Sequence, residues 1–341
     1  MSIPDPQTQV KIDAARSLVN QPHSVSLVPY RSIRDLLALH AKTSPNKPYL
    51  IAYDGEGQRS ELSYVEFVAR VHQVANFLYE DLGIRRGDRV ATLMVNDPDT
   101  VLIYFACWVI GAAVAPQNVT EDDARIAFIL RNSEAKVCFA MAEYLERAER
   151  IIHGGPGGDG ELGAPNIRAI IEVGGTPCDQ YISFHEAVRN RPTTFLADES
   201  GAKAGDLSLI AGSSAAAALH DEALLVYTSG TTGAPKGVVL TQYNLLVDAK
   251  GISDWQAITG NQRMMCVLPI HHVNGTVVTL MTPAYVGAST VLNRSFSVTH
   301  FWERVAREKV NIVSVVPTLL QFLVEYGRKS LAEGGTIFGG G

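Results

Sequence analysis

Tyr227-Thr228-Ser229-Gly230-Thr231-Thr232-Gly233-Ala234-Pro235-Lys236-Gly237 is the stretch of the chain that decides its fold. It follows the apolar run ALLVY at 223–227 and precedes a second apolar run at 238–240, so we expect a loop between two strands. Glycines let such a loop turn with positive φ, and its successive N–H groups then form a concave site for an anion. Lys236 adds a positive charge that suits phosphate. Hydroxyl groups add further donors, from Thr228, Ser229, Thr231 and Thr232. The stretch therefore predicts a phosphate-binding loop.

Two other kinds of loop fit part of this pattern. An ordinary hairpin loop needs glycine and sometimes asparagine or aspartate, but it does not need several hydroxyls and a lysine. A Walker-type phosphate loop has Ser or Thr after its lysine and continues into a helix. Here Gly237 follows the lysine and the next residues predict a strand. The pattern therefore favours a phosphate loop of a different type.

Strand and helix patterns alternate along the rest of the chain. Ser63-Tyr64-Val65-Glu66 is a capping-box signature, and the apolar residues that follow at intervals of three and four predict an amphipathic helix that ends at Gly83. A mostly apolar helix is expected at 98–110 with Gly111 as its stop, and Thr241 is expected to cap another. Short buried strands are expected at 89–94, 112–116, 136–140, 223–227, 264–268, 288–292 and 312–316. This alternation predicts an α/β fold in which mostly parallel sheets are flanked by helices.

Changes in composition indicate where this fold is interrupted. Residues 1–27 are a polar N-terminal tail with weak periodicity. The segment 198–218 consists of small and polar residues, so we expect it to be mobile. It would join two α/β parts, at about 28–197 and 219–341.

The overall composition limits the classes of function. Apolar residues make up 46% of the 341 residues and charged residues 19%, which is enough for a large buried core. The formal net charge is −6 and the basic residues are scattered, so we expect no nucleic-acid partner. The four cysteines are far apart and lie mostly in apolar runs, which favours buried thiols over disulfides or a zinc site. Neither a transmembrane segment nor the apolar core of a signal peptide is expected, which favours a cytoplasmic protein. The sequence gives no indication of oligomeric state.

The loop closely resembles the phosphate-binding signature of the adenylate-forming superfamily, the AMP-binding enzymes. This superfamily includes acyl- and aryl-CoA synthetases, firefly luciferase and the adenylation domains of peptide synthetases. Earlier segments resemble other motifs of the family in the same order: LSYVEF at 62–67, GDRV at 87–90 and GAAVAPQN at 111–118. The resemblance covers nearly the whole chain from about Ser32. It implies the N-terminal part of the large domain of an acyl-CoA synthetase.

A second candidate site is Leu268-Pro269-Ile270-His271-His272-Val273-Asn274-Gly275, which follows a predicted strand and precedes an apolar helix. From the residues alone, two histidines in a capped loop are more often structural than functional, and a zinc site would need further ligands. The resemblance favours function, because the family carries Pro-x-aromatic-His at this place. It implies that His272 lines the carboxylate pocket and takes part in catalysis, and that His271 fills the aromatic position. Asn274 and Gly275 would border the tunnel for the acyl group.

The resemblance also implies a reaction. ATP would convert a carboxylic acid, fatty or aryl, to an acyl-adenylate with release of pyrophosphate, and the thiol of coenzyme A would then displace AMP. Such a reaction needs no protein nucleophile, because the enzyme positions the reactants and stabilises charge on the phosphates. ATP, Mg²⁺ and coenzyme A are the expected cofactors, with Lys236 as a catalytic residue and Thr232 as the contact to Mg²⁺. The residues expected to hold the phosphates are Thr228, Ser229, Gly230, Thr231, Thr232, Gly233 and Lys236.

Several later motifs of the family do not occur in these 341 residues, among them the segment with the Mg²⁺-associated glutamate, the ribose-binding aspartate and the small C-terminal domain. The resemblance therefore implies an acid–thiol ligase of which this chain is an incomplete large domain, truncated before the C-terminal domain and inactive by itself. Thr231-Thr232 favours a CoA ligase over an amino-acid adenylation domain. Two alternatives stay open: an acyl-AMP ligase that loads a carrier protein, and a non-catalytic nucleotide-binding fragment.

Overall fold

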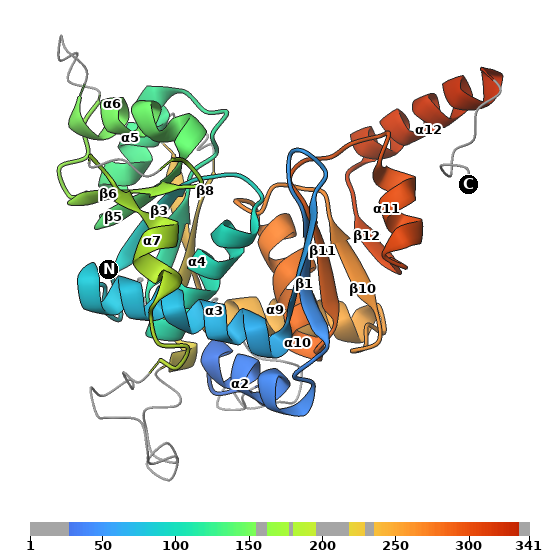
Figure 1. Cartoon of the computed structure of the whole chain (residues 1–341), viewed down its shortest axis with the longest axis horizontal. Helices are drawn as coiled ribbons and strands as arrows, with labels where there is room; N and C mark the ends of the chain where they lie inside the picture. Colours follow the sequence, from blue (N-terminus) through green and yellow to red (C-terminus); the bar gives the residue numbers. More distant parts are fainter. Residues whose placement is uncertain (1–26, 155–161, 177–179, 196–217, 229–234, 334–341) are drawn as a thin grey trace, which may run out of the picture.

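The computed structural model describes residues 27–154, 162–176, 180–195, 218–228 and 235–333. In this part of the chain, two β-sheets stand side by side with helices around and between them (Figure 1). Most neighbouring strands run parallel. The predicted α/β fold, with mostly parallel sheets flanked by helices, is therefore confirmed.

The larger sheet has seven strands in the order β7-β6-β5-β3-β4-β8-β9. Its neighbouring strands are parallel except for β8 and β9, which pair antiparallel. The strands are β3 (Arg89–Leu93), β4 (Ala113–Pro116), β5 (Val137–Met141), β6 (Ala169–Val173), β7 (Ile182–Ser183), β8 (Glu222–Thr228) and β9 (Lys236–Thr241). The sequence patterns predicted β3, β4, β5, β8 and β9, but not the two strands at the β7 edge.

The smaller sheet has five strands in the order β12-β10-β11-β1-β2. Its strands are β1 (Pro48–Tyr53), β2 (Arg59–Ser63), β10 (Arg263–Cys266), β11 (Ser289–Asn293) and β12 (Ile312–Ser314). The last three confirm the strands predicted near 264–268, 288–292 and 312–316. The β1–β2 hairpin was not predicted, although β1 lies in the centre of this sheet beside β11.

The helices surround the sheets and fill the space between them (Figure 1). They are α2 (Ile33–Thr43), α3 (Tyr64–Asn76), α4 (Pro98–Ile110), α5 (Asp123–Asn132), α6 (Leu145–His153), α7 (Phe184–Arg189), α9 (Gln242–Trp255), α10 (Thr282–Val286), α11 (Phe301–Arg307) and α12 (Pro317–Ala332). Shorter helical segments are η1 (Phe77–Asp81), η2 (Ala142–Tyr144) and η4 (Asn274–Met281), of which η1 and η4 are π-helical.

The predicted helix signals coincide with hydrogen-bonded caps. Ser63 and Glu66 form both bonds of a capping box at the start of α3, and Thr241 forms one with Asn244 at the start of α9. Gly111 ends α4 with φ 86°, where a side chain would also meet Asp221 Oδ2 at 2.8 Å. The glycine there is needed both for the backbone conformation and for space.

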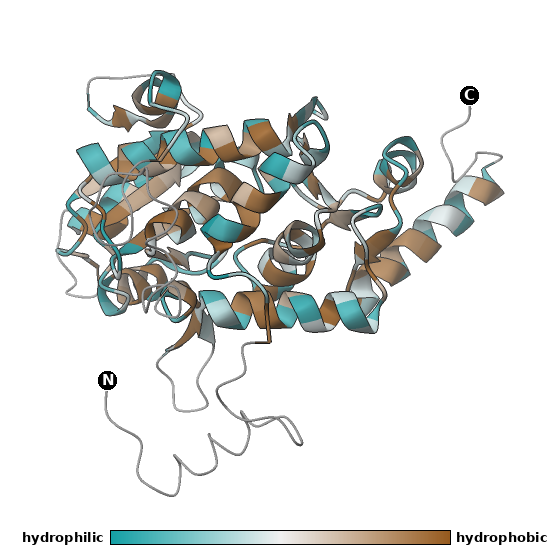
Figure 2. Ribbon diagram, turned by 90° about the horizontal axis from the view of Figure 1, so that it is seen from below, coloured by the Kyte–Doolittle hydropathy of each residue, from teal (hydrophilic) through white to brown (hydrophobic). Residues whose placement is uncertain are grey.

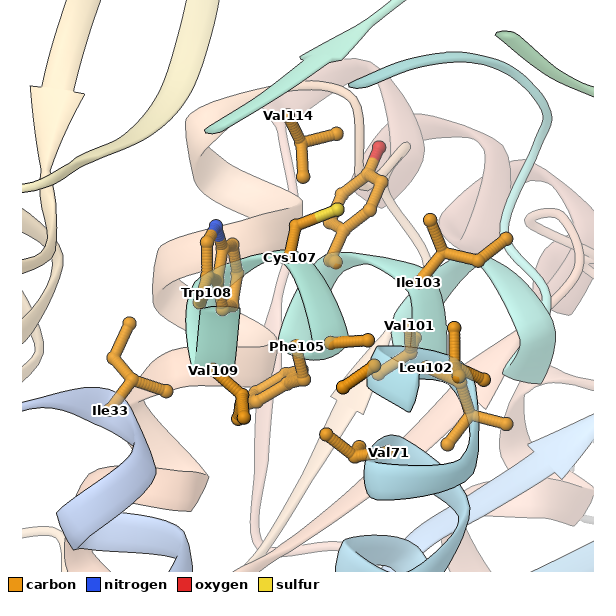
Figure 3. Packing of buried hydrophobic residues seen from close by; sticks show 14 of the residues in the cluster. Ile33, Val71, Val101, Leu102, Ile103, Phe105, Cys107, Trp108, Val109 and Val114 are labelled. Carbon is orange, nitrogen blue, oxygen red and sulfur yellow. The ribbon is translucent and has the colours of Figure 1, made fainter. Parts of the chain in front are cut away.

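Helix α4 is the centre of the hydrophobic core. Its side chains from Thr100 to Ile110 are all buried, and Figure 3 shows several of them packed among Ile33 of α2, Val71 of α3 and Val114 of β4. The indole N–H of Trp108, on this helix, donates to the carbonyl of Ala223 on β8 over 2.7 Å. The core thus joins helices from the first third of the chain to a strand that leads into the predicted phosphate loop.

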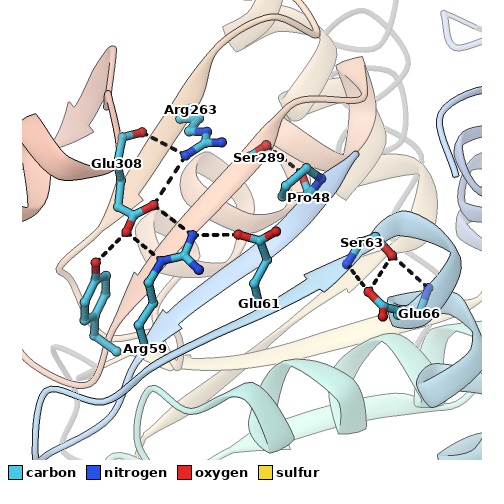
Figure 4. Close-up of polar contacts among 9 residues, drawn as sticks. Pro48, Arg59, Glu61, Ser63, Glu66, Arg263, Ser289 and Glu308 are labelled. Carbon is cyan, nitrogen blue, oxygen red and sulfur yellow. Dashed lines mark hydrogen bonds and ion pairs between the residues drawn. The ribbon is translucent and has the colours of Figure 1, made fainter. Parts of the chain in front are cut away.

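An ion-pair cluster ties the β1–β2 hairpin to the rest of the smaller sheet (Figure 4). The buried carboxylate of Glu308 accepts from Arg59 Nε over 2.8 Å and from Arg263 Nη1 over 3.3 Å. Burial alone would raise the pKa of Glu308, but hydrogen bonds from Arg59 and Tyr53 outweigh it and keep the pKa below its ordinary value. The hairpin is therefore fixed by paired charges as well as by the sheet.

Helix α12 projects from the body of the molecule and carries exposed hydrophobic residues along its length (Figures 1 and 2). These include Leu320, Phe322, Val324 and Leu331. Between α12, α11 and β12 lies an apolar groove of about 640 Å³.

The strand order does not follow the predicted division of the chain at 198–218. Strands β1 and β2 join β11 in the smaller sheet, and β8 and β9 join β4 in the larger one. Each sheet therefore takes strands from both sides of that segment. Parallel neighbours need long crossover connections, so strands that are far apart in the sequence can lie next to each other in a sheet. The segment itself lies outside the described residues except for Ala218, and so does the predicted tail at 1–27 except for Leu27.

Replacing Trp108 by Phe should destabilise the fold, because it removes a buried N–H donor and part of a fully packed ring. We expect a loss of about 1–3 kcal/mol in the free energy of unfolding. Urea unfolding followed by circular dichroism measures it. Trp255 is 89% exposed, so Trp255→Phe is the matched control and should change stability by less than about 0.5 kcal/mol. Equal losses in both variants would contradict the central role of α4.

Candidate active site

The predicted phosphate loop joins two antiparallel strands. Thr228 ends β8 and Lys236 begins β9, and these two residues face each other in the ladder. The loop is thus a hairpin connection in its topology, although its composition favoured a phosphate loop over an ordinary hairpin. The two descriptions are compatible, because a hairpin can present backbone N–H groups as well as any other turn.

Most of the loop's predicted contacts lie outside the described residues. These are Ser229, Gly230, Thr231, Thr232 and Gly233. The side chains of Thr228 and Lys236 are described, and both are exposed. Lys236 makes no ion pair with any residue that the structure describes. A lysine in this setting can bind an anionic ligand without first leaving another partner.

The base of the hairpin is shaped by Tyr227 and Gly237, which also face each other. A Cβ at Gly237 would lie 3.0 Å from the Tyr227 ring, so the glycine makes room for that ring. Gly237 does not have positive φ, and the predicted reason for this glycine was therefore wrong. The Tyr227 hydroxyl donates to Asn132 Oδ1 over 2.8 Å, which fixes the ring in place. Burial raises the pKa of Tyr227 to about 12, with Arg89 acting against the rise, so the hydroxyl stays protonated.

The larger sheet gathers the relevant strand ends at one edge. Val90, Val114 and Leu224 lie in one row across β3, β4 and β8. Further along these parallel strands, Thr228 ends β8 and Asn96 follows the end of β3. Strands β3 and β8 are two strand spacings apart, roughly 10 Å. In open α/β sheets, ligands bind beyond the carboxyl ends of the strands, and the hairpin and Asn96 both lie there.

Asn96 connects this edge to the segment that carries the two histidines, which we name the histidine turn (residues 268–272). Its side chain is buried, and its Nδ2 donates to the carbonyls of Leu268 and Asn293, each over 3.0 Å. Its Oδ1 accepts from the N–H of Ile270 over 2.8 Å. Sequence reasoning missed Asn96, although a polar residue shortly after a buried strand could have indicated it.

The histidine turn follows β10 and leads into the π-helix η4. The N–H of His272 donates to the carbonyl of Pro269 over 3.2 Å, and the N–H of Thr276 donates to the carbonyl of His272 over 3.0 Å. The helix predicted here is thus present, but its first part is π-helical. Segments of π-helix are rare and are often found at functional sites.

The two histidines differ in their surroundings. His272 is exposed, whereas His271 is half-buried and its Nε2 has no hydrogen-bond partner among the described residues. The centres of the two rings are 4.2 Å apart. Burial, followed by the nearby His272, lowers the pKa of His271 to about 4, so His271 is neutral at pH 7.

Asn274 and Gly275 support the turn from the other side. Asn274 Oδ1 accepts from Ser314 Oγ on β12 over 2.8 Å. A Cβ at Gly275 would lie 2.3 Å from the Pro269 carbonyl oxygen and 2.7 Å from Ile270 Cα. Gly275 is thus explained by its close packing against the turn and Asn274 by its hydrogen bond to β12, and the place of both beside an acyl tunnel stays a prediction.

Among the described residues, no three His, Cys, Asp or Glu side chains gather where they could hold a metal ion. The predicted Mg²⁺ contact, Thr232, lies outside those residues. None of the described helices is long and apolar enough to cross a membrane.

Gly275→Ala should disturb the histidine turn, because the added methyl group meets backbone atoms that cannot rotate away. We expect a loss of about 1–3 kcal/mol in the free energy of unfolding, measured in urea. Gly251 offers a matched control, since it is an exposed residue of α9 with no atom within 4 Å of an added Cβ. Gly251→Ala should stabilise the protein by about 0.5–1 kcal/mol. An unchanged free energy of unfolding in Gly275→Ala would show that the turn has room for a methyl group at this position.

His271 should make stability depend on pH. Its folded pKa lies below the ordinary value of 6.5, so the unfolded chain binds a proton that the folded chain excludes. The part of the free energy of unfolding that depends on His271 is therefore fully present above about pH 6.5, and it is lost as the pH falls toward 4. Replacing His271 by Asn should remove roughly 2–3 kcal/mol of that loss, as measured by urea unfolding between pH 7.5 and 4. Parallel pH profiles of wild type and His271→Asn would contradict the burial of this ring.

Comparisons with known proteins agree with this arrangement. The family model of the AMP-binding enzymes matches residues 37–338. The chain is 28% identical to a sulfoacetate–CoA ligase of Cupriavidus necator over 300 residues, which cover 86% of this chain and 51% of that protein. It is 29% identical to a crotonobetaine/carnitine–CoA ligase of Salmonella agona over 280 residues, which cover 82% of this chain and 50% of that protein.

A solved structure gives the same result at the level of the fold. The crystal structure of an anthranilate CoA ligase in complex with anthranoyl-AMP has a TM-score of 0.71 and 25% identity, covering 86% of this chain and 51% of that one. The chain thus spans about half the length of the curated relatives described above. The match over 37–338 confirms the resemblance seen in the hairpin loop, and this chain belongs to the family of AMP-binding enzymes.

Proposed function

We propose that this chain serves the ATP-dependent activation of a carboxylic acid to an acyl-adenylate, followed by thioester formation with coenzyme A. One observation carries the proposal. Lys236 and Thr228 are exposed and face each other at the carboxyl ends of the strands of the larger sheet. Asn96 lies at the same edge, and its hydrogen bonds attach the histidine turn there. An anionic nucleotide at the hairpin and a carboxylate at the histidines would then lie close enough to react.

The hairpin would supply the charge for the nucleotide. A carboxylate is a poor electrophile, and bound ATP supplies an α-phosphate that it can attack and pyrophosphate as the leaving group. The ammonium group of Lys236 would neutralise negative charge on the outer phosphates, and backbone N–H groups and hydroxyls of residues 228–233 would donate to the same oxygens. Mg²⁺ would share this charge near Thr232, as part of the same proposal.

The histidine turn would receive the acid. His272 is exposed and can donate a hydrogen bond from its ring to a carboxylate. His271 is neutral at pH 7 because burial lowers its pKa, so it adds no second charge that would hold the carboxylate too tightly to react. Its half-buried ring gives His272 a fixed neighbour. Asn274 and Gly275 would shape the path of the acyl group beside the turn.

The proposal extends to the acid and to the compartment. A fatty or aryl acid is the proposed substrate, and the aryl form is supported by the relative whose structure holds anthranoyl-AMP. The names of the two ligases described above refer to acids that carry further charged groups, so experiment must decide which acid is used. A cytoplasmic location is supported by the free, buried thiols of Cys107, Cys138 and Cys266.

Lys236→Ala should weaken the binding of ATP to this chain by roughly 10–100-fold, because a charged hydrogen bond to phosphate is worth about 1.5–3 kcal/mol. Isothermal titration with ATP measures the change. Lys250 lies on α9 and is paired with Asp254, so Lys250→Ala changes the net charge equally without touching the hairpin and is the matched control. A similar affinity for ATP in the wild type, Lys236→Ala and Lys250→Ala would show that Lys236 does not contact the nucleotide.

Carboxylate-dependent exchange between ATP and pyrophosphate tests the reaction itself. It should be measured on this chain and on the longest product of the same gene, with acetate, octanoate, palmitate and benzoate. We expect exchange in the longer product, and the active acid names the substrate class. Coenzyme A and a phosphopantetheinylated carrier protein, compared as acceptors, separate the CoA ligase from an acyl-AMP ligase. Binding of ATP without exchange for any acid would favour a non-catalytic nucleotide-binding protein.

A further inference from the structure

Asn96 has the contacts of a residue that positions its neighbours. Its side chain makes three hydrogen bonds to backbone atoms far away in the sequence, at Leu268, Ile270 and Asn293. A carbonyl can only accept and an N–H can only donate, so these partners fix which end of the amide is nitrogen and which is oxygen. The side chain is 4% exposed, and water cannot readily replace these bonds.

We propose that Asn96 is a positioning residue for the histidine turn, which it holds from both sides of Pro269 at the carboxyl edge of the larger sheet. It accepts from the residue after the proline and donates to the residue before it. The turn between these anchors cannot change its path without breaking a buried bond. His271 and His272 follow directly after the second anchor, so their orientation depends on it.

Asn96 is itself held firmly. The hydroxyl of Thr100 donates to the carbonyl of Val95 over 2.8 Å, and Asp97 is the N-cap of α4. Asp97 also accepts from Arg294 over 3.0 Å. Asn96 therefore stands between a buried strand and a buried helix, and such rigid elements hold a supported group more precisely than a free loop does.

The position of the turn relative to the hairpin follows from the same bonds. Asn96 belongs to the segment after β3, in the sheet that carries Thr228 and Lys236, whereas the histidine turn follows β10 in the other sheet. Asn96 thus sets how far His272 lies from the proposed nucleotide site. That the acid meets His272 there rests on the proposed function, but the role of Asn96 in the turn does not.

The chain offers a matched control in Asn76. Its side chain is also buried, and its Nδ2 donates to the carbonyls of Pro192 and Thr194 over 2.9 and 3.0 Å. Asn76→Ala therefore removes a buried amide of the same kind, whose partners lie outside the turn. An effect that came only from a general loss of stability would therefore appear in both Asn96→Ala and Asn76→Ala.

Amide hydrogen exchange at Ile270 and the titration of the His271 ring, both followed by NMR on the full chain, test the role of Asn96. In Asn96→Ala, exchange at Ile270 should rise about tenfold or more, because the N–H loses its buried acceptor. The pKa of His271 should rise from about 4 toward 6.5 as the turn admits water. The titratable neighbour that lowers this pKa alongside burial is His272, which is present in every variant. Asn76→Ala should leave both readings at their wild-type values.

Asn96→Ser is the second variant, because it adds no charge and keeps one hydrogen-bonding group if the alanine variant does not fold. It should change both readings in the same direction by smaller amounts. Unchanged exchange and titration in the folded variant, or equal changes in Asn76→Ala, would overturn the proposal. These readings need neither ATP nor acid, so they can succeed where pyrophosphate exchange fails.

Kinetics of the longest gene product test the consequence for the acid. Asn96→Ala should raise the acid concentration for half-maximal pyrophosphate exchange by about tenfold, because the histidines are misplaced. The ATP concentration for half-maximal exchange should stay within about twofold, since the hairpin is untouched. Equal rises for acid and ATP would overturn a specific role in placing the histidine turn.

Discussion

The candidate site depends on one joint between the two sheets, at the short segment that leaves β3 and begins α4. Asn96 in this segment binds the backbone around Pro269 and Asn293, and Asp97 beside it is paired with Arg294. Burial and Asp99 raise the pKa of Asp97, and Arg294 acts against that rise. Buried groups of this kind are costly to leave unpaired, far more than surface hydrogen bonds are to lose. The joint therefore selects one placement of the smaller sheet against the larger, and with it one distance between the histidine turn and the hairpin.

The two halves of the site differ in charge for a physical reason. Phosphate carries several negative charges and binds best where a cation is exposed and unpaired, as Lys236 is among the described residues. A carboxylate that must act as a nucleophile in the proposed reaction needs weaker contacts, because strong ion pairing would lower its reactivity. His271 supplies a neutral surface, since burial keeps its pKa near 4. The exposed ring of His272 then provides a hydrogen bond to the carboxylate.

Much of the fold could be predicted from the sequence, but the joint could not. Helix α4 was predicted with its bounds at Pro98 and Ile110, because a long apolar run that stops at a glycine is a clear helix pattern. The β1–β2 hairpin and the exchange of strands between the sheets were missed, since strand pairing depends on contacts between residues far apart in the sequence. The same holds for Asn96, whose three backbone partners lie at least 172 residues away. Local patterns thus identify the elements and the two motifs, whereas long-range bonds join the histidine turn to the sheet that carries the hairpin.

The hairpin topology also accounts for the unusual composition of the loop. In a Walker-type loop, the N-terminus of the following helix contributes a positive field at the phosphates. Here the loop returns directly into β9, so no helix follows it to supply that field. The attraction for an anion must then come from the loop's own donors and from a nearby cation. That requirement explains why hydroxyl residues are so frequent between Thr228 and Thr232, and why Lys236 stands at the first position of the returning strand, directly opposite Thr228.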